Sequence, residues 1–366
     1  YANLIYQSII GSTNHKFKTG MSFQFDDYDE RLSSANEIKV VRDGTEELIT
    51  VLNFDRTERV PGAFVEYTYD YADKISVVAG LRADHHNLFG LVVTPRLHTR
   101  FNLSPTSTLR LSAGKGTRIA NLLTENTGLL VSARQFVFAG SQSVYAYGYK
   151  PEMAWNYGVN FSQDFNLDYR PGSITVDYFF TDFKNQVIVD LDQSAREANF
   201  YPLSGNSFSH SFQFQSDYQV MRRFDVRLAY RYLDVRTDYL SGLLERPLIA
   251  KHRAFVNLAY ETRNKWKFDY TVQWLGRQRI PDTSLNPAGY RLNPYAGSYV
   301  LMNAQITKDL RDRWSMYVGM ENIGNFSLQN PIISAAEPFS EYFDSSLVWG
   351  PVFGRMTYFG VRYRIN

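Results

Sequence analysis

The sequence of 366 residues contains no cysteine and carries a formal net charge of only +2. The lack of cysteine excludes disulfide frameworks, thiolate metal sites and cysteine nucleophiles together. The small net charge gives no electrostatic reason to expect a nucleic-acid partner. No stretch approaches the ~18 consecutive apolar residues that a transmembrane helix needs, which excludes a helical membrane protein. The long apolar runs and helical periods of α/β enzymes are almost missing as well.

What the sequence does contain is an aromatic fraction of 16%, 23 glycines and a regular alternation of apolar and polar residues. The clearest case is residues 266–274 (WKFDYTVQW), in which every even position is apolar or aromatic and every odd position is polar. Successive side chains of a strand point to opposite faces, so this pattern predicts a strand with one apolar and one polar face. Residues 254–261 repeat the pattern, and the short polar turn between the two segments predicts a hairpin.

Fifteen segments of this kind follow one another along the chain. They centre near residues 1–11, 15–27, 60–71, 75–85, 92–103, 107–117, 152–165, 173–184, 207–219, 224–236, 251–262, 265–276, 298–308, 313–323 and 355–366.

The connections between these segments alternate between short and long. The short ones lie at residues 12–14, 72–74, 104–106, 166–172, 220–223, 263–264 and 309–312. The others, of which only the second is brief, lie at residues 28–59, 86–91, 118–151, 185–206, 237–250, 277–297 and 324–354. Short turns at one end and long loops at the other are typical of an outer-membrane β-barrel, with periplasmic turns and extracellular loops.

A soluble β-sandwich or propeller also alternates, but sandwich strands are shorter, with a mode of ~5–6 residues, and their turns do not segregate by length. Aromatic residues lie near the ends of the outward face, as at Trp266 and Trp274. Such residues form the girdle expected at a membrane interface. We therefore predict an all-β protein, a transmembrane antiparallel β-barrel of which about 15 strands are present.

Strand parity indicates that these strands are not a whole barrel. Bacterial outer-membrane barrels have an even number of strands and two periplasmic termini. Here residues 1–11 lead into a short turn and residues 355–366 follow a long loop, so both segments run inward and the count is odd. The chain also begins within a strand and has no signal peptide. We expect residues 1–366 to be the C-terminal portion of a larger barrel, with the N-terminal strands absent from this sequence.

The size of the complete barrel is left open by parity. If it has about 22 strands, as plugged outer-membrane transporters do, the segments are its eighth to its last strand. A porin of about 16 strands that lacks only its first strand has the same parity. The long links favour the larger barrel.

The sequence resembles the C-terminal barrel region of TonB-dependent receptors over essentially its whole length. The matching stretches are residues 55–64 (DRTERVPGAF), 94–98 (TPRLH), 111–121 (LSAGKGTRIAN), 150–158 (KPEMAWNYG), 182–187 (DFKNQV) and 322–325 (NIGN). This resemblance implies a barrel of about 22 strands, an N-terminal plug domain, a periplasmic TonB-box segment and energy-coupled import of a scarce nutrient. No stretch of this chain matches the plug or the TonB box.

Residues 118–151 contain the first group of candidate ligand-binding residues. On the larger count they form the seventh extracellular loop, which often touches cargo in the family that the sequence resembles. Arginine and asparagine offer fixed donors that suit carboxylate or chelate ligands. The alternative is that they pair with the plug or with carboxylates of neighbouring strands. The candidates are Arg118, Asn121, Glu125, Asn126, Arg134 and Gln135.

Tyr145 and Tyr147 extend this candidate site, because they begin an aromatic-rich approach to the next strand. Aromatic side chains at a barrel mouth can stack on a planar ligand. They serve as often as interface anchors, here for lipopolysaccharide. Both interpretations remain open at this point.

Asp84, His85 and His86 form the second candidate site, since aspartate and histidine can bind a transition metal. Adjacent residues of a strand point to opposite faces, so the two histidines cannot both face one ion without a bend. A polar strand end is the favoured interpretation. If the cargo is a metal, His86 or His85 is the expected first contact.

The pattern as a whole predicts a transporter in the cell outer membrane and not an enzyme. Residues 114–116 (GKG) lack the spacing and the helix of a phosphate loop, and we find no catalytic constellation and expect no cofactor. The partners that the resemblance implies are the plug, a TonB-type energy-coupling protein, outer-membrane lipid with lipopolysaccharide, and a nutrient ligand. A passive porin is the main alternative, and an adhesin or secretion barrel is a third. Iron chelates, haem, cobalamin, metals, peptides and glycans all remain open as cargo.

Overall fold

The computed structural model describes residues 1–42, 44–140, 146–310 and 313–365. Its main feature is a meander in which fifteen long strands each pair antiparallel with the next. They are β1 (Ala2–Ile9), β2 (His15–Arg42), β3 (Thr45–Tyr71), β4 (Ile75–His86), β5 (Gly90–Ser104), β6 (Ser107–Arg118), β8 (Glu152–Leu167), β9 (Arg170–Lys184), β12 (Ser207–Met221), β13 (Phe224–Tyr239), β15 (His252–Glu261), β16 (Trp266–Leu275), β19 (Tyr299–Leu310), β20 (Trp314–Glu321) and β21 (Met356–Tyr363).

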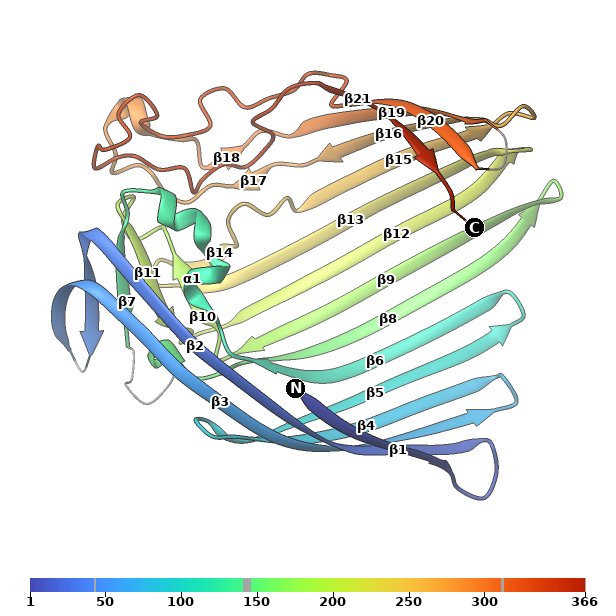
Figure 1. Cartoon of the computed structure of the whole chain (residues 1–366), viewed down its shortest axis with the longest axis horizontal. Helices are drawn as coiled ribbons and strands as arrows, with labels where there is room; N and C mark the ends of the chain where they lie inside the picture. The colour runs from blue at the N-terminus through green and yellow to red at the C-terminus, as the bar shows by residue number, and fades with distance from the viewer. Residues whose placement is uncertain (43, 141–145, 311–312, 366) are drawn as a thin grey trace.

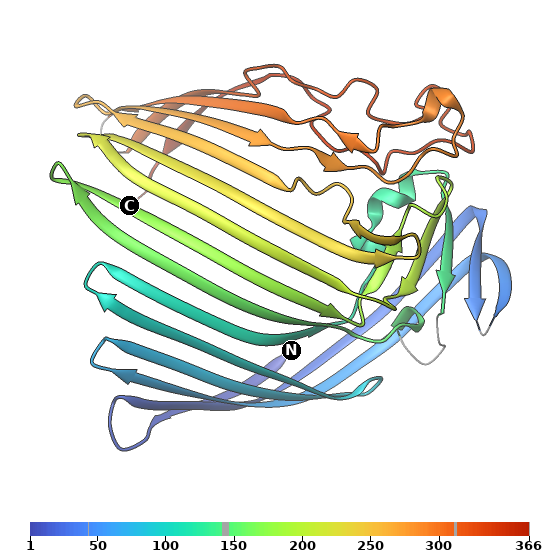
Figure 2. The same ribbon diagram turned by 180° about the vertical axis from the view of Figure 1, so that it is seen from behind.

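The fifteen strands confirm the fifteen segments that the alternation predicted. Figures 1 and 2 show them side by side as one strongly curved wall, with short turns at one end and long connections at the other. The predicted turn at residues 309–312 lies partly outside the described residues. Among the described residues no pairing joins β1 to β21, so the wall is an open sheet.

The register of neighbouring strands separates the wall into two chemically different faces. Asn257 on β15 stands opposite Thr271 on β16, and its side-chain amide donates to the Thr271 hydroxyl at 2.8 Å. On the other face Val256 stands opposite Val272, and Leu228 from β13 is 43% exposed. The inner face is polar and has hydrogen bonds between strands, whereas the outer face is apolar and exposed. A barrel wall that separates water from lipid has two such faces.

The connection at residues 28–59 is not the loop that the sequence predicts, and this expectation was wrong. β2 and β3 continue through it as a ribbon that stays paired from Asp29 opposite Asp55 to Arg42 opposite Thr45. The register shifts once in the ribbon, between Ser33 and Ile38. Two-sided polar segments carry no face pattern, which is why the alternation ends near residue 27.

Two further connections add strands to this ribbon. β7 (Gln135–Ala139) pairs parallel with β2 and also parallel with β11 (Glu197–Pro202), and β11 pairs antiparallel with β10 (Val187–Asp190). We call β10, β11, β7 and the outer parts of β2 and β3 the loop sheet. It brings together three connections that are far apart in the sequence.

The loop sheet contains the main hydrophobic core. Ile38, Phe138 and Phe200 are each at most 2% exposed, and the rings of Phe138 and Phe200 stack at 4.9 Å. Short elements complete this end of the molecule: α1 (Leu122–Glu125), η1 (Thr127–Val131), η2 (Ala146–Gly148), β14 (Gly242–Glu245), β17 (Gln278–Arg279), η3 (Ala288–Tyr290) and β18 (Tyr295–Ala296). In the ranges that the structure describes, no helix has the length and apolar character needed to cross a membrane.

Candidate functional site

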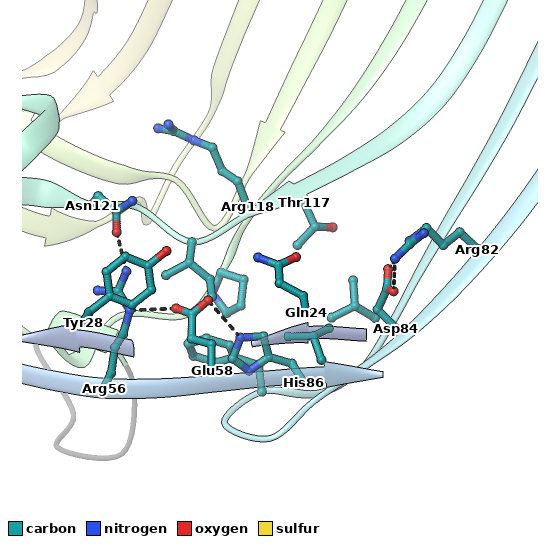
Figure 3. Close-up of a pocket in the computed structure, with 15 residues that line it drawn as sticks. Gln24, Tyr28, Arg56, Glu58, Arg82, Asp84, His86, Thr117, Arg118 and Asn121 are labelled. Carbon is teal, nitrogen blue, oxygen red and sulfur yellow. Dashed lines mark hydrogen bonds and ion pairs between the residues drawn. The ribbon is translucent and has the colours of Figure 1, made fainter. Parts of the chain in front are cut away.

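A cavity of about 400 Å³ lies where the wall meets the loop sheet, and we call it the Arg56 pocket (Figure 3). Five strands, β2 to β6, and the connection at residues 118–151 supply most of its side chains. They are Gln24, Tyr28, Arg56, Glu58, Val60, Arg82, Asp84, His86, Phe89, Val92, Thr117, Arg118, Ile119, Asn121 and Pro151.

Strand periodicity explains why charged side chains gather there. Arg82, Asp84 and His86 are alternate residues of β4, so all three point to the same inner face. Arg56 and Glu58 are alternate residues of β3, and they lie just beyond the part of β3 that pairs with β4. Because β3 pairs with β4, with Gly62 opposite Asp84, the two polar rows meet at the rim of the wall.

Arg56 is the most firmly held side chain of the pocket. It is 8% exposed, and its Nε donates to Glu58 Oε1 at 2.7 Å while Nη2 donates to the Asn121 side-chain oxygen. Its guanidinium also lies 3.8 Å from the centre of the Tyr28 ring. The remaining nitrogen, Nη1, is buried without a hydrogen-bond partner among the described residues.

His86 and Thr117 present two more buried atoms that have no hydrogen-bond partner among the described residues. His86 Nδ1 accepts the Leu88 backbone N–H at 3.1 Å, so a neutral His86 carries its proton on Nε2. That Nε2 lies 3.6 Å from Glu58 Oε2, which is too long for a hydrogen bond. The Thr117 hydroxyl is also buried without a partner within the described chain. All three free atoms can donate, so the pocket offers hydrogen bonds to oxygen acceptors.

The other charges of the pocket are matched within the chain. Arg118 Nε donates to Glu152 Oε2 at 2.6 Å, and its two terminal nitrogens each donate to Glu125 at 3.0 Å. Arg82 forms an ion pair with Asp84 at 2.6 Å. For Arg118, the alternative that it pairs with a carboxylate of the neighbouring strand is therefore confirmed.

The structure places only part of the first candidate group at this pocket. Arg118 and Asn121 line it, and Glu125 is bonded to Arg118. The side-chain amide of Asn126 instead donates to the Leu122 carbonyl at 2.8 Å, within the same turn. That of Gln135 donates to the Glu37 carbonyl at 2.8 Å, inside the loop sheet.

Arg134 lies away from the pocket, in the interior of the loops. Its Nε donates to Asp344 at 2.8 Å, and its Nη1 donates to the carbonyl oxygens of Ser194 and Glu197. At 2% exposure it cannot reach a ligand in this conformation. Arg134 holds three connections together.

Tyr147 is buried as well, and its hydroxyl donates to Glu30 on the ribbon. Burial and then this hydrogen bond raise the pKa of Tyr147 well above its ordinary value. The phenol is therefore a neutral donor at physiological pH. Tyr145 lies outside the described residues.

The second candidate group does not form a metal site. Asp84 is bonded to Arg82, His86 points into the pocket, and His85 is exposed on the opposite face. In the part of the chain that the structure describes, no three side chains of His, Cys, Asp or Glu are grouped to hold a metal ion. The expectation that adjacent histidines face opposite ways is confirmed, and the metal interpretation of Asp84, His85 and His86 is not supported.

Sequence reasoning missed the residues at the centre of the pocket, Tyr28, Arg56 and Glu58. They lie in the ribbon that was expected to be a loop. The alternation of Arg56, Glu58 and Val60 on one face of β3 is a local signal that could have indicated the two charged residues.

A curved antiparallel wall with one polar and one apolar face, below long folded connections, is the architecture of an outer-membrane β-barrel. Residues 2–323 match the family model described as TonB dependent receptor-like, beta-barrel. The chain therefore belongs to this family, whose members are receptors and transporters of the outer membrane and not enzymes. A search of the curated proteins found no match.

Several solved structures share the fold. The ferric enterobactin receptor PfeA from Pseudomonas aeruginosa, in complex with BCV-L6, has a TM-score of 0.70 at 15% identity, over 99% of this chain and 53% of that one. FpvA from P. aeruginosa, bound to a heterologous pyoverdine with iron, has a TM-score of 0.67 at 15% identity. The match covers 99% of this chain and 47% of FpvA. The FrpB iron transporter from Neisseria meningitidis has a TM-score of 0.65 at 13% identity. The match covers 99% of this chain and 54% of FrpB. The chain thus spans about half the length of these structures, and at such low identities the likeness shows the fold alone.

Proposed function

We propose that the chain is the C-terminal barrel portion of an outer-membrane receptor for energy-coupled, TonB-dependent uptake of a scarce nutrient. An iron chelate is the first cargo class to test, because the similar receptors PfeA and FpvA carry ferric enterobactin and pyoverdine in their names or complexes. The rest of such a receptor would supply the plug domain and the remaining barrel strands, for a total of about 22.

The Arg56 pocket is the observation that carries this proposal. It combines three buried donors that have no hydrogen-bond partner within the described residues, at the loop end of the polar face: Arg56 Nη1, His86 Nε2 and the Thr117 hydroxyl. Unpaired buried donors cost free energy unless an acceptor or water binds them. The oxygen atoms that surround iron in a chelate are acceptors of the required kind, so cargo held here would offset that cost.

The partners follow from the same proposal. The plug would fill the polar interior, an inner-membrane TonB-type protein would supply energy by acting on the plug, and lipid with lipopolysaccharide would surround the apolar face. The cargo would meet the loop sheet first and then the Arg56 pocket.

Uptake of radioactive iron by whole cells tests this function. A strain that lacks the complete gene should lose uptake of at least one ferric chelate, and a plasmid copy should restore it. In the restored strain an agent that collapses the proton-motive force should stop uptake but leave surface binding intact. Uptake that continues without the proton-motive force would instead support the passive porin.

A further inference from the structure

The brief connection between β4 and β5 is a tight turn that a histidine side chain closes. His86, the last residue of β4, stands opposite Gly90, the first residue of β5. Gly90 has a φ of +73°, the left-handed conformation that a three-residue hairpin turn needs at this point. His86 Nδ1 accepts the Leu88 backbone N–H at 3.1 Å, the bond that asparagine and aspartate make in Asx turns. We call residues 86–90 the His86 turn.

Asn87 joins this turn to the edge of β3. Its backbone N–H donates to the Arg59 carbonyl at 3.2 Å, and its side-chain oxygen accepts the Arg59 N–H at 2.8 Å. Its side-chain amide also donates to the Thr57 carbonyl at 2.9 Å. The pairing of β3 with β4 ends at Gly62 opposite Asp84, so Asn87 bonds backbone groups of a strand edge that lies beyond this pairing.

The closed turn requires a neutral imidazole. An imidazolium carries a proton on both ring nitrogens and can accept no hydrogen bond, so protonation of His86 breaks the bond from Leu88. The same proton creates an attraction to Glu58, whose Oε2 lies 3.6 Å from His86 Nε2. The acid form therefore loses the bond that closes the turn and gains an ion pair on β3.

Glu58 is the acidic group that a protonated His86 would meet. It shares its carboxylate with Arg56, which donates to the other oxygen, Oε1, at 2.7 Å. Asp84 also lines the pocket, but two hydrogen bonds from Arg82 hold its carboxylate. The other titratable groups near the ring are Tyr28 of β2 and Arg118 of β6 in the pocket, and His85 on the opposite face of β4.

We propose that the His86 turn is an acid-sensitive switch. The turn stays bonded to the edge of β3 while the imidazole is neutral, and it is released from that edge when the imidazole binds a proton. The switch acts between parts of this chain and needs no cargo. Its test is therefore independent of the uptake experiment.

Hydrogen exchange of the complete receptor, followed by mass spectrometry, tests the switch. The observable is the protection of the Asn87, Leu88 and Arg59 amides relative to unfolded peptides at the same pH. A series from about pH 7.5 to about pH 4.5 brackets the ordinary histidine pKa of ~6.5. In the wild type the protection should fall with acid by about 3- to 10-fold, the effect of one lost hydrogen bond.

Two variants of His86 that cannot take up a proton should remove this pH dependence in opposite ways. In His86→Asn the side-chain oxygen can accept the Leu88 N–H at every pH, so protection should stay high. In His86→Gln the longer side chain lacks an acceptor at the Nδ1 position, so protection should stay low. His85→Gln is the matched control, since His85 is exposed on the opposite face, and it should behave as the wild type does.

Two results would overturn the proposal. One is wild-type protection of the three amides that does not change with pH. The other is an acid-induced fall that persists in His86→Asn or in His86→Gln, because a group other than His86 would then cause it. Each variant tests the proposal by itself, so a folding failure of one leaves the other decisive.

Discussion

Arg134 and Asp344 are 210 positions apart in the sequence and form an ion pair with 1% and 4% side-chain exposure. Asp344 also pairs through its backbone with Ser132 and Ile333, so the pair joins the connection at residues 118–151 to the last connection of the chain. Arg134 reaches the carbonyl groups of a third connection as well. The long connections are thus one folded layer and not independent loops.

Breaking this pair should loosen that layer and leave the wall intact. In Arg134→Ala the Asp344 carboxylate stays buried without its cation, which costs ~3–5 kcal/mol. We expect proteases to cut the loops of the variant much faster, with unchanged protection of the wall strands. The double variant Arg134→Met with Asp344→Leu removes both charges and should recover much of the resistance. Equal cleavage of the single variant and the wild type would contradict the role of this pair.

Two neighbouring positions of β15 test the assignment of the faces. Val256→Arg places a charge on the apolar face and should cost ~2–4 kcal/mol of unfolding free energy in a lipid bilayer. Asn257→Arg places the same charge on the polar face, next to Asp269, and should have a mild effect. Unfolding of both variants from lipid vesicles measures the difference. An equal loss of unfolding free energy in the two variants would show that the faces are wrongly assigned.

The contact between Gly319 and Tyr358 should be sensitive to a single methyl group. The two residues are register partners on β20 and β21, and a Cβ at position 319 would collide with the Tyr358 ring. Displacing this ring also breaks its hydrogen bond to Gln305, so Gly319→Ala should cost ~1–3 kcal/mol. Gly116→Ala is the control, since nothing lies within 4 Å of its added Cβ. Thermal unfolding should distinguish the two variants, and equal Tm values would refute the contact.

Alkaline pH should weaken the loop sheet through Tyr147. Its pKa is raised in the folded state by burial and by the hydrogen bond to Glu30, while an unfolded tyrosine titrates near ~10. The stabilisation is therefore complete below about pH 10 and is lost as the pH rises further. Proteolysis of the loops should accelerate above that pH in the wild type. In Tyr147→Phe this increase in the rate of proteolysis at alkaline pH should be smaller. An unchanged increase would exclude Tyr147 as its source.

The wall could be predicted from the sequence because its signal is local. Each strand such as β16 separates a polar from an apolar face, and this alternation is readable in ten residues. The ribbon and the loop sheet give no such signal. β2 reaches its strand partner β7 about a hundred positions later, and that pairing depends on side chains such as Phe138 and Phe200 meeting in space.

The candidate site could be predicted only in part, because only some of its residues carry a local signal in the sequence. Arg118 and Asn121 were recognised from their residue types in a long connection. Arg56 was not, because its partner Asn121 is 65 positions away and its strand was expected to be a loop.

Binding of ferric chelates to energy-depleted cells that carry the complete receptor tests the central claim, that the Arg56 pocket holds cargo, most directly. Loss of hydrogen bonds from a charged donor costs ~1.5–3 kcal/mol, so Arg56→Met should raise the Kd for the transported chelate by about 10- to 100-fold. Arg110→Met, which removes an inner-face arginine bonded to Asn160, should leave the Kd unchanged. A Kd for Arg56→Met equal to that of the wild type, with the variant present at normal levels in the membrane, would contradict the account.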